Sequence, residues 1–516
     1  MSLSARFLGW LRKEWPSLGV VALAVLAQLV LVARPFDFYL TNLLTDDAFY
    51  YFQIARHIAE GLGSTFDGIT PTNGYHPLWL VILVGIYKWF SAGGAELELP
   101  IRAALYLSLA FNAATWLLAA RVIARVPMAA YLRAIALFIF ACNPFLLYQT
   151  LNGLETSLAL MVFALFTLFA VRFEEGKGSA WALGIVAGAM TLARLDMGLY
   201  AFAFLVWLMW TRGWSASRKD ALTFVLVAGA TAAPWFLWNL VQFHTLLTSS
   251  SLSETLVNHQ LIVQDHGASI AQFLKAVLYF SQRALEDVFE RTGMYALACA
   301  LFGAALALLC ARALPLPRTR KEIPVLAALF GGFVLLFIGN ASVRWTMREW
   351  YFVSFGLFLA LLCANVLARV FAHITYKKSA ALVFFAAVFF SFTVDWSKAL
   401  RGGDQSPLDM RAAAIWQSEH LPPGTRVGAF NSGIQGYFSK AQVINLDGLV
   451  NNAAYDALRE KRLWAYIHEA RIAYLIDFPF YLTYRYKSFL GTDTPQSDLT
   501  LVTTIGSSSL SVWRVK

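Results

Sequence analysis

The sequence has few charged residues for its length. Only 14% of its 516 residues are Asp, Glu, Lys or Arg, whereas 59% are hydrophobic. A soluble globular domain has about 25% charged and about 45–50% apolar residues. Apolar runs recur along residues 1–400, and a helix needs about 20 apolar residues to cross a bilayer. This composition excludes a soluble protein over that range and predicts a polytopic membrane protein.

Cysteine is also scarce, and no basic stripe is present. The four cysteines, Cys142, Cys299, Cys310 and Cys363, all lie inside apolar runs and lack the paired spacing of a zinc site. We therefore interpret them as small core residues. The formal charge is +10, but the basic residues lie mainly in short loops between apolar runs. That distribution reports membrane orientation and argues against a nucleic-acid-binding surface.

A cleavable signal peptide is not indicated either. The first apolar run, 18–33, follows Arg12 and Lys13, is longer than a usual signal-peptide core and lacks a convincing cleavage site. We expect an uncleaved first membrane helix with its N-terminus in the cytoplasm. No solenoid-type repeat is visible.

The later apolar runs predict further membrane helices. The run 76–90 is short and contains Lys88, so we interpret it as an interfacial helix. All later basic loops then lie inside, which gives about eleven crossings and an outside C-terminus. The expected spans after the first are 101–120, 134–147, 155–171, 181–191, 198–210, 221–241, 292–311, 324–339, 350–368 and 380–394.

The composition changes to that of a soluble protein near residue 400. Turn signals such as PPGT and NSG separate short β-rich runs from helical stretches. The expected strands are 426–430, 443–446, 472–476, 500–505 and 509–515, and the expected helices are 408–420 and 453–470. We expect a membrane domain over 1–400 and a small α/β domain over 401–516 on the outer side. The other long outer segment, 244–291, is a candidate for a mobile lid or acceptor-facing loop.

Charged residues near the membrane gather at the outer ends of the expected helices. They are Asp46, Asp47, Arg102, Glu155, Arg194, Asp196, Arg344, Arg348 and Glu349. Charges at membrane depth are costly and tend to mark function. Because separate loops bring these residues to one side of the membrane, we expect one concave site containing carboxylates and guanidiniums. Few charges lie at helix midpoints, so an ion or proton path across the bilayer is not indicated.

The residue types in this site suit one kind of chemistry. An aspartate can act as general base toward an acceptor hydroxyl. Arginine binds phosphate well because its planar fork presents several donors. A lipid-linked phosphate suits an interfacial site, because the lipid tail stays in the bilayer while the head enters the pocket. These inferences follow from charge and position and do not identify a sugar.

The polar segment after the first apolar run carries a family resemblance. DDAFYYFQIARHIAEGLGSTFDG (46–68), followed by TNGYHPLW (72–79), resembles the first outer loop of the GT-C superfamily of integral-membrane glycosyltransferases. It is most similar to bacterial members related to the arabinofuranosyltransferases that use polyprenyl-phosphate sugars. Further matches follow in order: LNGLET (151–156), LARLD (192–196), PWFLWN (234–239), REWYF (348–352) and the tail segment 428–451. No WWD-type motif of oligosaccharyltransferases is present, which argues against transfer of a whole glycan to asparagine.

The resemblance implies roles for individual residues. Asp46 or Asp47 would be the catalytic base, and we favour Asp46, which lies nearer the end of the preceding helix. The donor phosphate would be met by Arg102, Arg194, Arg344 or Arg348. Glu155, Asp196 and Tyr351 join the donor-binding set, and Asn73, Tyr75 and His76 would line the pocket. Some members of this superfamily use a metal, but the first outer loop contains no DxD motif and adjacent acids suit a metal-free base as well. We therefore expect no cofactor and no metal.

Structural roles remain open for these residues. Asp46 and Asp47 could cap the helix that follows, and Glu155 could cap the helix after Gly153. Arg194 and Asp196 could form a structural ion pair. Arg344 and Arg348 could hold lipid head groups, and His76 could close a turn.

The sequence therefore predicts a glycosyltransferase in a bacterial plasma membrane. It would move a single hexose or pentose from a polyprenyl-phosphate donor to an extracytoplasmic glycan, lipid or protein. A transporter or flippase of a lipid-linked sugar is the alternative, and it would require polar inner helix halves and pseudo-symmetry that the sequence lacks. A non-catalytic scaffold whose tail recruits envelope partners is a third possibility.

Overall fold

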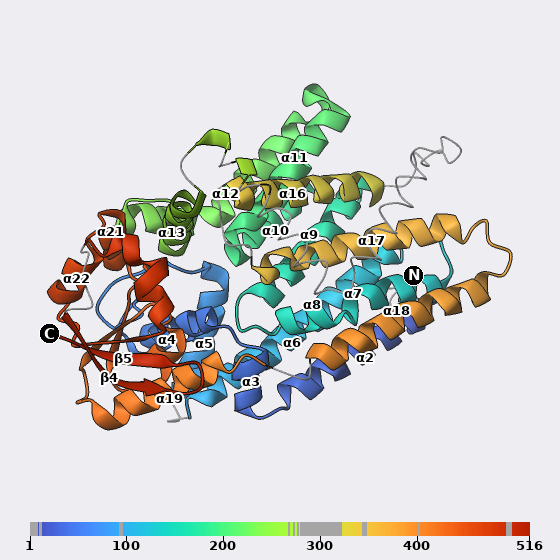
Figure 1. Ribbon diagram of the computed structural model, residues 1–516. Helices are drawn as coiled ribbons and strands as arrows, with labels where there is room; N and C mark the ends of the chain where they lie inside the picture. Colours follow the sequence, from blue (N-terminus) through green and yellow to red (C-terminus); the bar gives the residue numbers. More distant parts are fainter. Residues whose placement is uncertain are drawn as a thin grey trace.

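The protein consists of a helical bundle joined to a mixed α/β unit. The computed structural model describes residues 13–91, 96–266, 322–342, 348–399, 403–491 and 498–516, with isolated positions at 9, 269–271, 274, 275 and 278. Long helices lie roughly side by side, and the strands gather at one end of the bundle together with the C-terminus (Figure 1).

The bundle is built from apolar helices. Its helices are α2 (Trp15–Val32), α6 (Glu98–Ile123), α7 (Ala130–Ala141), α8 (Pro144–Gln149), α9 (Thr156–Glu174), α10 (Ala180–Ala193), α11 (Gly198–Arg212), α12 (Trp214–Phe243), α16 (Glu322–Ser342), α17 (Val353–Val370) and α18 (Lys377–Ala399). Within the described ranges, five helical stretches are long and apolar enough to cross a membrane: Trp15–Val32, Glu98–Ile123, Thr156–Glu174, Trp214–Phe243 and Trp350–Val370. The predicted polytopic helical fold is confirmed, because every expected span that the structure describes falls on a helix. The expected span 292–311 lies outside the described residues.

One expected span is interrupted. The run 134–147 divides into α7 and α8, because Asn143 and Pro144 start a new helix. The Asn143 side chain accepts a hydrogen bond from the backbone N–H of Leu146 at 3.4 Å, and Pro144 occupies the first turn, where its missing N–H costs nothing.

Short helices connect the first span to the site. They are α3 (Phe36–Asn42), α4 (Asp46–Glu60), α5 (Pro77–Ser91) and, farther along the chain, α13 (Ser249–His266). The helix α4 ends at Gly61, which adopts φ = 85°, the left-handed conformation common after helices. The first part of the long segment 244–291 is α13, and the rest lies largely outside the described residues.

The C-terminal unit has a five-stranded sheet in the order β2-β1-β3-β5-β4. The strands are β1 (Arg426–Ala429), β2 (Gln442–Asn445), β3 (Tyr474–Asp477), β4 (Leu499–Ile505) and β5 (Leu510–Val515). β1 is parallel to β2 and β3, whereas β5 is antiparallel to β3 and β4. The helices are α19 (Ser406–His420), α20 (Gly433–Phe438), α21 (Asn452–Arg459) and α22 (Leu463–Glu469), followed by short turns at Tyr481–Arg485 and Lys487–Phe489. All five predicted strands are confirmed, the stretch 453–470 is two helices, and α20 was not predicted.

The C-terminal unit packs on α4. Arg56 donates a hydrogen bond to the carbonyl oxygen of Tyr437 at 3.2 Å, and the rings of Phe49 and Tyr437 meet edge to face at 5.7 Å. Gly433 at the start of α20 lies so close to α4 that a Cβ there would clash with the backbone carbonyl oxygen of Asp46. This approach requires a residue without a side chain.

We expect Gly433→Ala to destabilise the protein by about 1–3 kcal/mol, because the added methyl group must push α20 away from α4. The measurement is the melting temperature of the purified protein in detergent. Gly85→Ala is the matched control, because a Cβ at Gly85 meets no atom within 4 Å. Equal melting temperatures for the two variants would contradict the close packing.

Candidate active site

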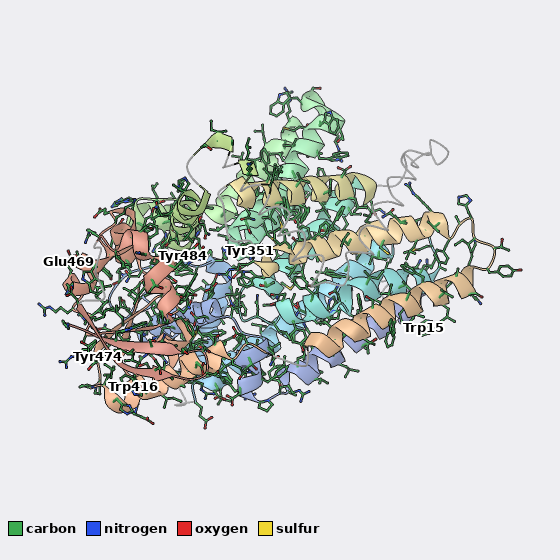
Figure 2. All side chains as sticks on the ribbon, viewed as in Figure 1. Trp15, Tyr351, Trp416, Glu469, Tyr474 and Tyr484 are labelled. Carbon is green, nitrogen blue, oxygen red and sulfur yellow. The ribbon has the colours of Figure 1, made fainter. Side chains whose placement is uncertain are left out.

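A cavity of about 870 Å³ lies where the bundle, α13 and the C-terminal unit meet. Figure 2 shows Tyr351, one of its lining residues, at the end of the bundle that faces the C-terminal unit. The charged and aromatic residues that line it are Asp47, Tyr50, Tyr51, Tyr75, His76, Glu155, Arg194, Asp196, Glu254, His259, Arg348, Trp350, Tyr351 and Tyr455. The expected convergence of carboxylates and guanidiniums therefore occurs for the described members of the set.

The two adjacent acids of α4 have different surroundings. Successive residues of an α-helix point about 100° apart, since the helix has 3.6 residues per turn. Asp47 lines the cavity together with Tyr51, one turn later. Asp46 instead accepts hydrogen bonds from the backbone N–H groups of Gly433 and Ile434 at 3.1 and 2.8 Å. The acid favoured from the sequence is thus the one that binds the C-terminal unit.

Asp46 stabilises the start of α20. Burial raises the pKa of its carboxyl to about 7, although the two N–H bonds favour the charged form. The N-cap position of α4 belongs to Thr45, and both acids lie in the first turn, where the helix dipole favours negative charge. The capping role considered from the sequence therefore applies to Asp46, but on a different helix.

Asp47 is exposed to the cavity. Burial raises the pKa of its carboxyl above the usual value, the positive charge of Arg348 opposes this shift, and Glu254 and Glu155 add to it. Among the residues that the structure describes, none donates a hydrogen bond to the Asp47 carboxylate. A raised pKa and an unoccupied acceptor are what a general base requires.

Arg348 is the positively charged residue whose charge acts on Asp47. Burial alone would lower the pKa of its guanidinium, but the carboxylates of Asp47 and Glu254 more than offset this, and the pKa is raised. The guanidinium carbon lies 5.8 Å from the ring centre of Trp350. No carboxylate in the described part of the chain forms an ion pair with Arg348, so its donors are available to an anion in the cavity.

Arg194 is already fully paired. Its Nε and Nη2 donate to the two carboxylate oxygens of Asp196 at 2.8 and 2.9 Å, and its Nη1 donates to Glu155 at 3.1 Å. The ring of Tyr351 lies 4.4 Å from the guanidinium carbon. The structural ion pair considered for Arg194 and Asp196 is therefore present, and Glu155 extends it.

Glu155 connects this ion pair to α4. It occupies the N-cap position of α9, yet its side chain makes no capping bond. Instead, the hydroxyl of Tyr51 donates to its Oε2 at 3.0 Å, and Nε2 of His76 lies 3.6 Å from its Oε1. The capping role proposed from the sequence is thus wrong for the Glu155 side chain, because a buried guanidinium and a phenol bind it.

His76 is held in one orientation. Its Nδ1 accepts a hydrogen bond from the backbone N–H of Leu195 at 3.3 Å, which assigns the proton of a neutral ring to Nε2, toward Glu155. Burial lowers the pKa of His76, although the charge of Glu155 opposes the shift. A neutral His76 therefore positions the loop before α5 beside the cavity.

Two expected site residues lie elsewhere. Arg102 donates a hydrogen bond to the hydroxyl of Tyr39 at 3.0 Å and lies 3.6 Å from Glu98, away from the cavity lining. Asn73 is buried behind the cavity and donates to the Asn239 side chain at 3.0 Å. Arg344 lies outside the described residues, as does the side chain of Glu349.

Several residues that line the cavity were not predicted from the sequence. Tyr50 and Tyr51 were not predicted as site residues, and Glu254 belonged to the segment proposed as a lid. Spacing by four residues along 250–259 could have indicated a helix with one polar face. Leu449 and Tyr455 of the C-terminal unit also line the cavity, and no local signal in the sequence indicates this.

Residues 399–513 match a family described as a domain of unknown function, DUF8728. No curated protein matches the sequence. No group of three or more His, Cys, Asp or Glu in the described part of the chain could hold a metal ion.

Solved structures resemble the whole chain at low sequence identity. ArnT from Cupriavidus metallidurans, bound to undecaprenyl phosphate, matches with a TM-score of 0.58 and 15% identity over 96% of this chain and 98% of that chain. The same protein in the apo state gives 0.54 and 14% over 99% and 98%. The Archaeoglobus fulgidus oligosaccharyltransferase, in complex with zinc and sulfate, gives 0.58 and 13% over 94% and 72%. The resemblance seen in the sequence is confirmed at the level of architecture: this chain shares the fold of ArnT and of the oligosaccharyltransferase.

Proposed function

We propose that the protein is a membrane glycosyltransferase that moves a single hexose or pentose from a polyprenyl phosphate to an extracytoplasmic glycan, lipid or protein. The observation that carries this proposal is the shared cavity of Asp47 and Arg348, a carboxylate and a guanidinium that form no hydrogen bond or ion pair with other described residues. The GT-C fold and the undecaprenyl phosphate bound to the structurally similar ArnT support a lipid-linked donor.

In this proposal Asp47 is the base, in place of the previously favoured Asp46. Asp47 takes the proton of the acceptor hydroxyl, whose oxygen forms a bond to the anomeric carbon of the donor sugar. The bond between that carbon and the phosphate oxygen breaks, and the polyprenyl phosphate leaves with the electron pair. Arg348 stabilises the negative charge that develops on the departing phosphate.

The remaining residues have supporting roles in this mechanism. Arg194 positions the cavity wall through Asp196 and Glu155, since all three of its nitrogens already donate to carboxylates. Tyr75, His76 and Tyr351 line the substrate pocket. Arg344 remains a candidate phosphate ligand on sequence grounds, and Arg102 and Asn73 are no longer included.

We further propose a bacterial plasma-membrane location with the cavity on the outer side. The lipid tail of the donor would remain in the bilayer while its sugar phosphate enters the cavity. The C-terminal unit, which we assign to residues 401–516, would lie outside the membrane. It would form one wall of the cavity, and residues 1–400 would form the rest. The basic loops on the opposite side support this orientation.

We expect Asp47→Asn to reduce sugar transfer by about 10²–10⁴-fold, because the amide cannot accept the proton of the acceptor. The measurement is the amount of polyprenyl-phosphate sugar in lipid extracts of a deletion strain that expresses each variant, since unused donor accumulates. Asp456→Asn, at an exposed aspartate of α21, is the control and should restore the wild-type lipid profile.

The variant Asp46→Asn distinguishes the roles of the two acids. It weakens the contact with α20 but leaves the proposed base in place, so it should retain more activity than Asp47→Asn. Loss of transfer in Asp46→Asn together with full transfer in Asp47→Asn would reverse the assignment. Full activity in both variants would exclude an α4 carboxylate as the base.

The activity should be lost as the pH falls, at a pH above the usual titration range of aspartate. The base must be deprotonated, and burial raises the pKa of Asp47. Arg348→Gln should move this acid limb to still higher pH, because it removes the positive charge that opposes the shift. The measurement is kcat/KM against pH in proteoliposomes. An acid limb at the same pH in wild type and Arg348→Gln would contradict the coupling of these two groups.

A further inference from the structure

Glu254 is a cavity carboxylate that the mechanism above does not use. It lies on α13, where Ser250, Glu254 and Asn258 are spaced by four residues and share one face of the helix. Ser250 and Glu254 line the cavity. A different face contacts the C-terminal unit: Ser253 donates to the Asp447 carbonyl, and Val257 is buried in that unit's core. The packing of α13 therefore fixes which side chains it presents to the cavity.

One oxygen of the Glu254 carboxylate is anchored. Its Oε2 accepts hydrogen bonds from Nδ2 of Asn258 at 2.8 Å and from Nη2 of Arg485 at 3.4 Å. Figure 2 shows Tyr484, the neighbour of Arg485, beside α13. Within the described part of the chain, Oε1 accepts no hydrogen bond. The two contacts hold the carboxylate in place and leave Oε1 as an acceptor for a molecule in the cavity.

Glu254 lines the same cavity as the proposed reacting groups, Asp47 and Arg348. Its negative charge also raises the pKa of both groups. A sugar whose phosphate lies at Arg348 and whose anomeric carbon faces the acceptor near Asp47 therefore occupies the cavity that Glu254 lines. An ionised carboxylate is an acceptor only, so its natural partner on such a sugar is a hydroxyl group.

We propose that Oε1 of Glu254 accepts a hydrogen bond from a hydroxyl group of the donor sugar and so helps to select that sugar. This inference rests on the proposed function. A hydrogen bond from a hydroxyl to an ionised oxygen is stronger than one between neutral groups. A site built to bind a hydroxyl rejects an analogue that lacks it, because the buried acceptor is then left unpaired.

A purely structural role for Glu254 would give different results. Arg485 lies in the C-terminal unit, so its contact with Glu254 also ties α13 to that unit. If the contact served only this purpose, removing either partner would have the same effect on the cavity. The variants Glu254→Gln and Arg485→Gln are therefore compared, with Asp456→Asn as the control for an unrelated exposed carboxylate.

The experiment measures binding to the full-length protein in lipid nanodiscs. The probes are undecaprenyl phosphate and undecaprenyl phosphates that carry one pentose or hexose, each with analogues lacking a single hydroxyl. For the glycosylated probe that binds wild type best, Glu254→Gln should weaken affinity about tenfold. Affinity for undecaprenyl phosphate itself should change less than about twofold. One deoxy analogue should bind wild type and Glu254→Gln equally, which identifies the hydroxyl.

The other possible results would contradict either sugar binding by Glu254 or the proposed function. Equal loss of affinity for undecaprenyl phosphate and for the glycosylated probe, or the same sugar-specific loss in Arg485→Gln, would overturn sugar binding by Glu254. Sugar-dependent affinity that is unchanged in Glu254→Gln would overturn this inference alone. If no sugar improves binding to wild type over undecaprenyl phosphate, the proposed function fails together with it. Should Glu254→Gln lower the melting temperature, Glu254→Asp, which retains the charge but withdraws Oε1, replaces it with the same expected loss.

Discussion

The different surroundings of Asp46 and Asp47 depend on the hydrogen bonds between the first turn of α4 and the first turn of α20. The Asp46 carboxylate accepts hydrogen bonds from the backbone N–H groups of Gly433 and Ile434. The absence of a side chain at Gly433 allows the two helices to come into contact. Once Asp46 is fixed in this way, the 100° step between neighbouring helical residues directs Asp47 to another side. The rotation of one short helix therefore separates a carboxylate that supports the fold from one that is available for chemistry.

The charges of the cavity form two groups with different properties. Arg194, Asp196 and Glu155 satisfy one another and bind Tyr51 and His76 of the first outer loop, so they constitute a rigid wall. Arg348 lacks an ion-pair partner among the described residues and interacts with Asp47 only through the field between them. Breaking a buried ion pair to bind a ligand is costly, whereas an unpaired guanidinium can accept a phosphate directly. This difference, rather than the number of arginines, is why Arg348 is the one that we propose as the phosphate ligand.

Much of the architecture could be predicted from the sequence because it depends on local signals. Apolar runs predicted the long helices, short β-rich runs between turn signals predicted the five strands, and the charges at outer helix ends indicated the position of the site. The choice between Asp46 and Asp47 could not be made, because it depends on a contact with residues 388 positions away in the chain. Arg102 was assigned to the site because it lies at a helix end. In the structure it forms an ion pair with Glu98 and a hydrogen bond with Tyr39, away from the cavity. Lining residues from the C-terminal unit likewise depend on tertiary packing alone.

The contact between α4 and α20 also has a consequence for biosynthesis. At about 5–20 residues per second, the ribosome needs on the order of 20–80 s to synthesise the 388 residues between Asp46 and Ile434. During that interval α4 has emerged, but the N–H groups that bind Asp46 do not yet exist. The hydrogen bonds that join Asp46 to the C-terminal unit can therefore form only when translation is nearly complete.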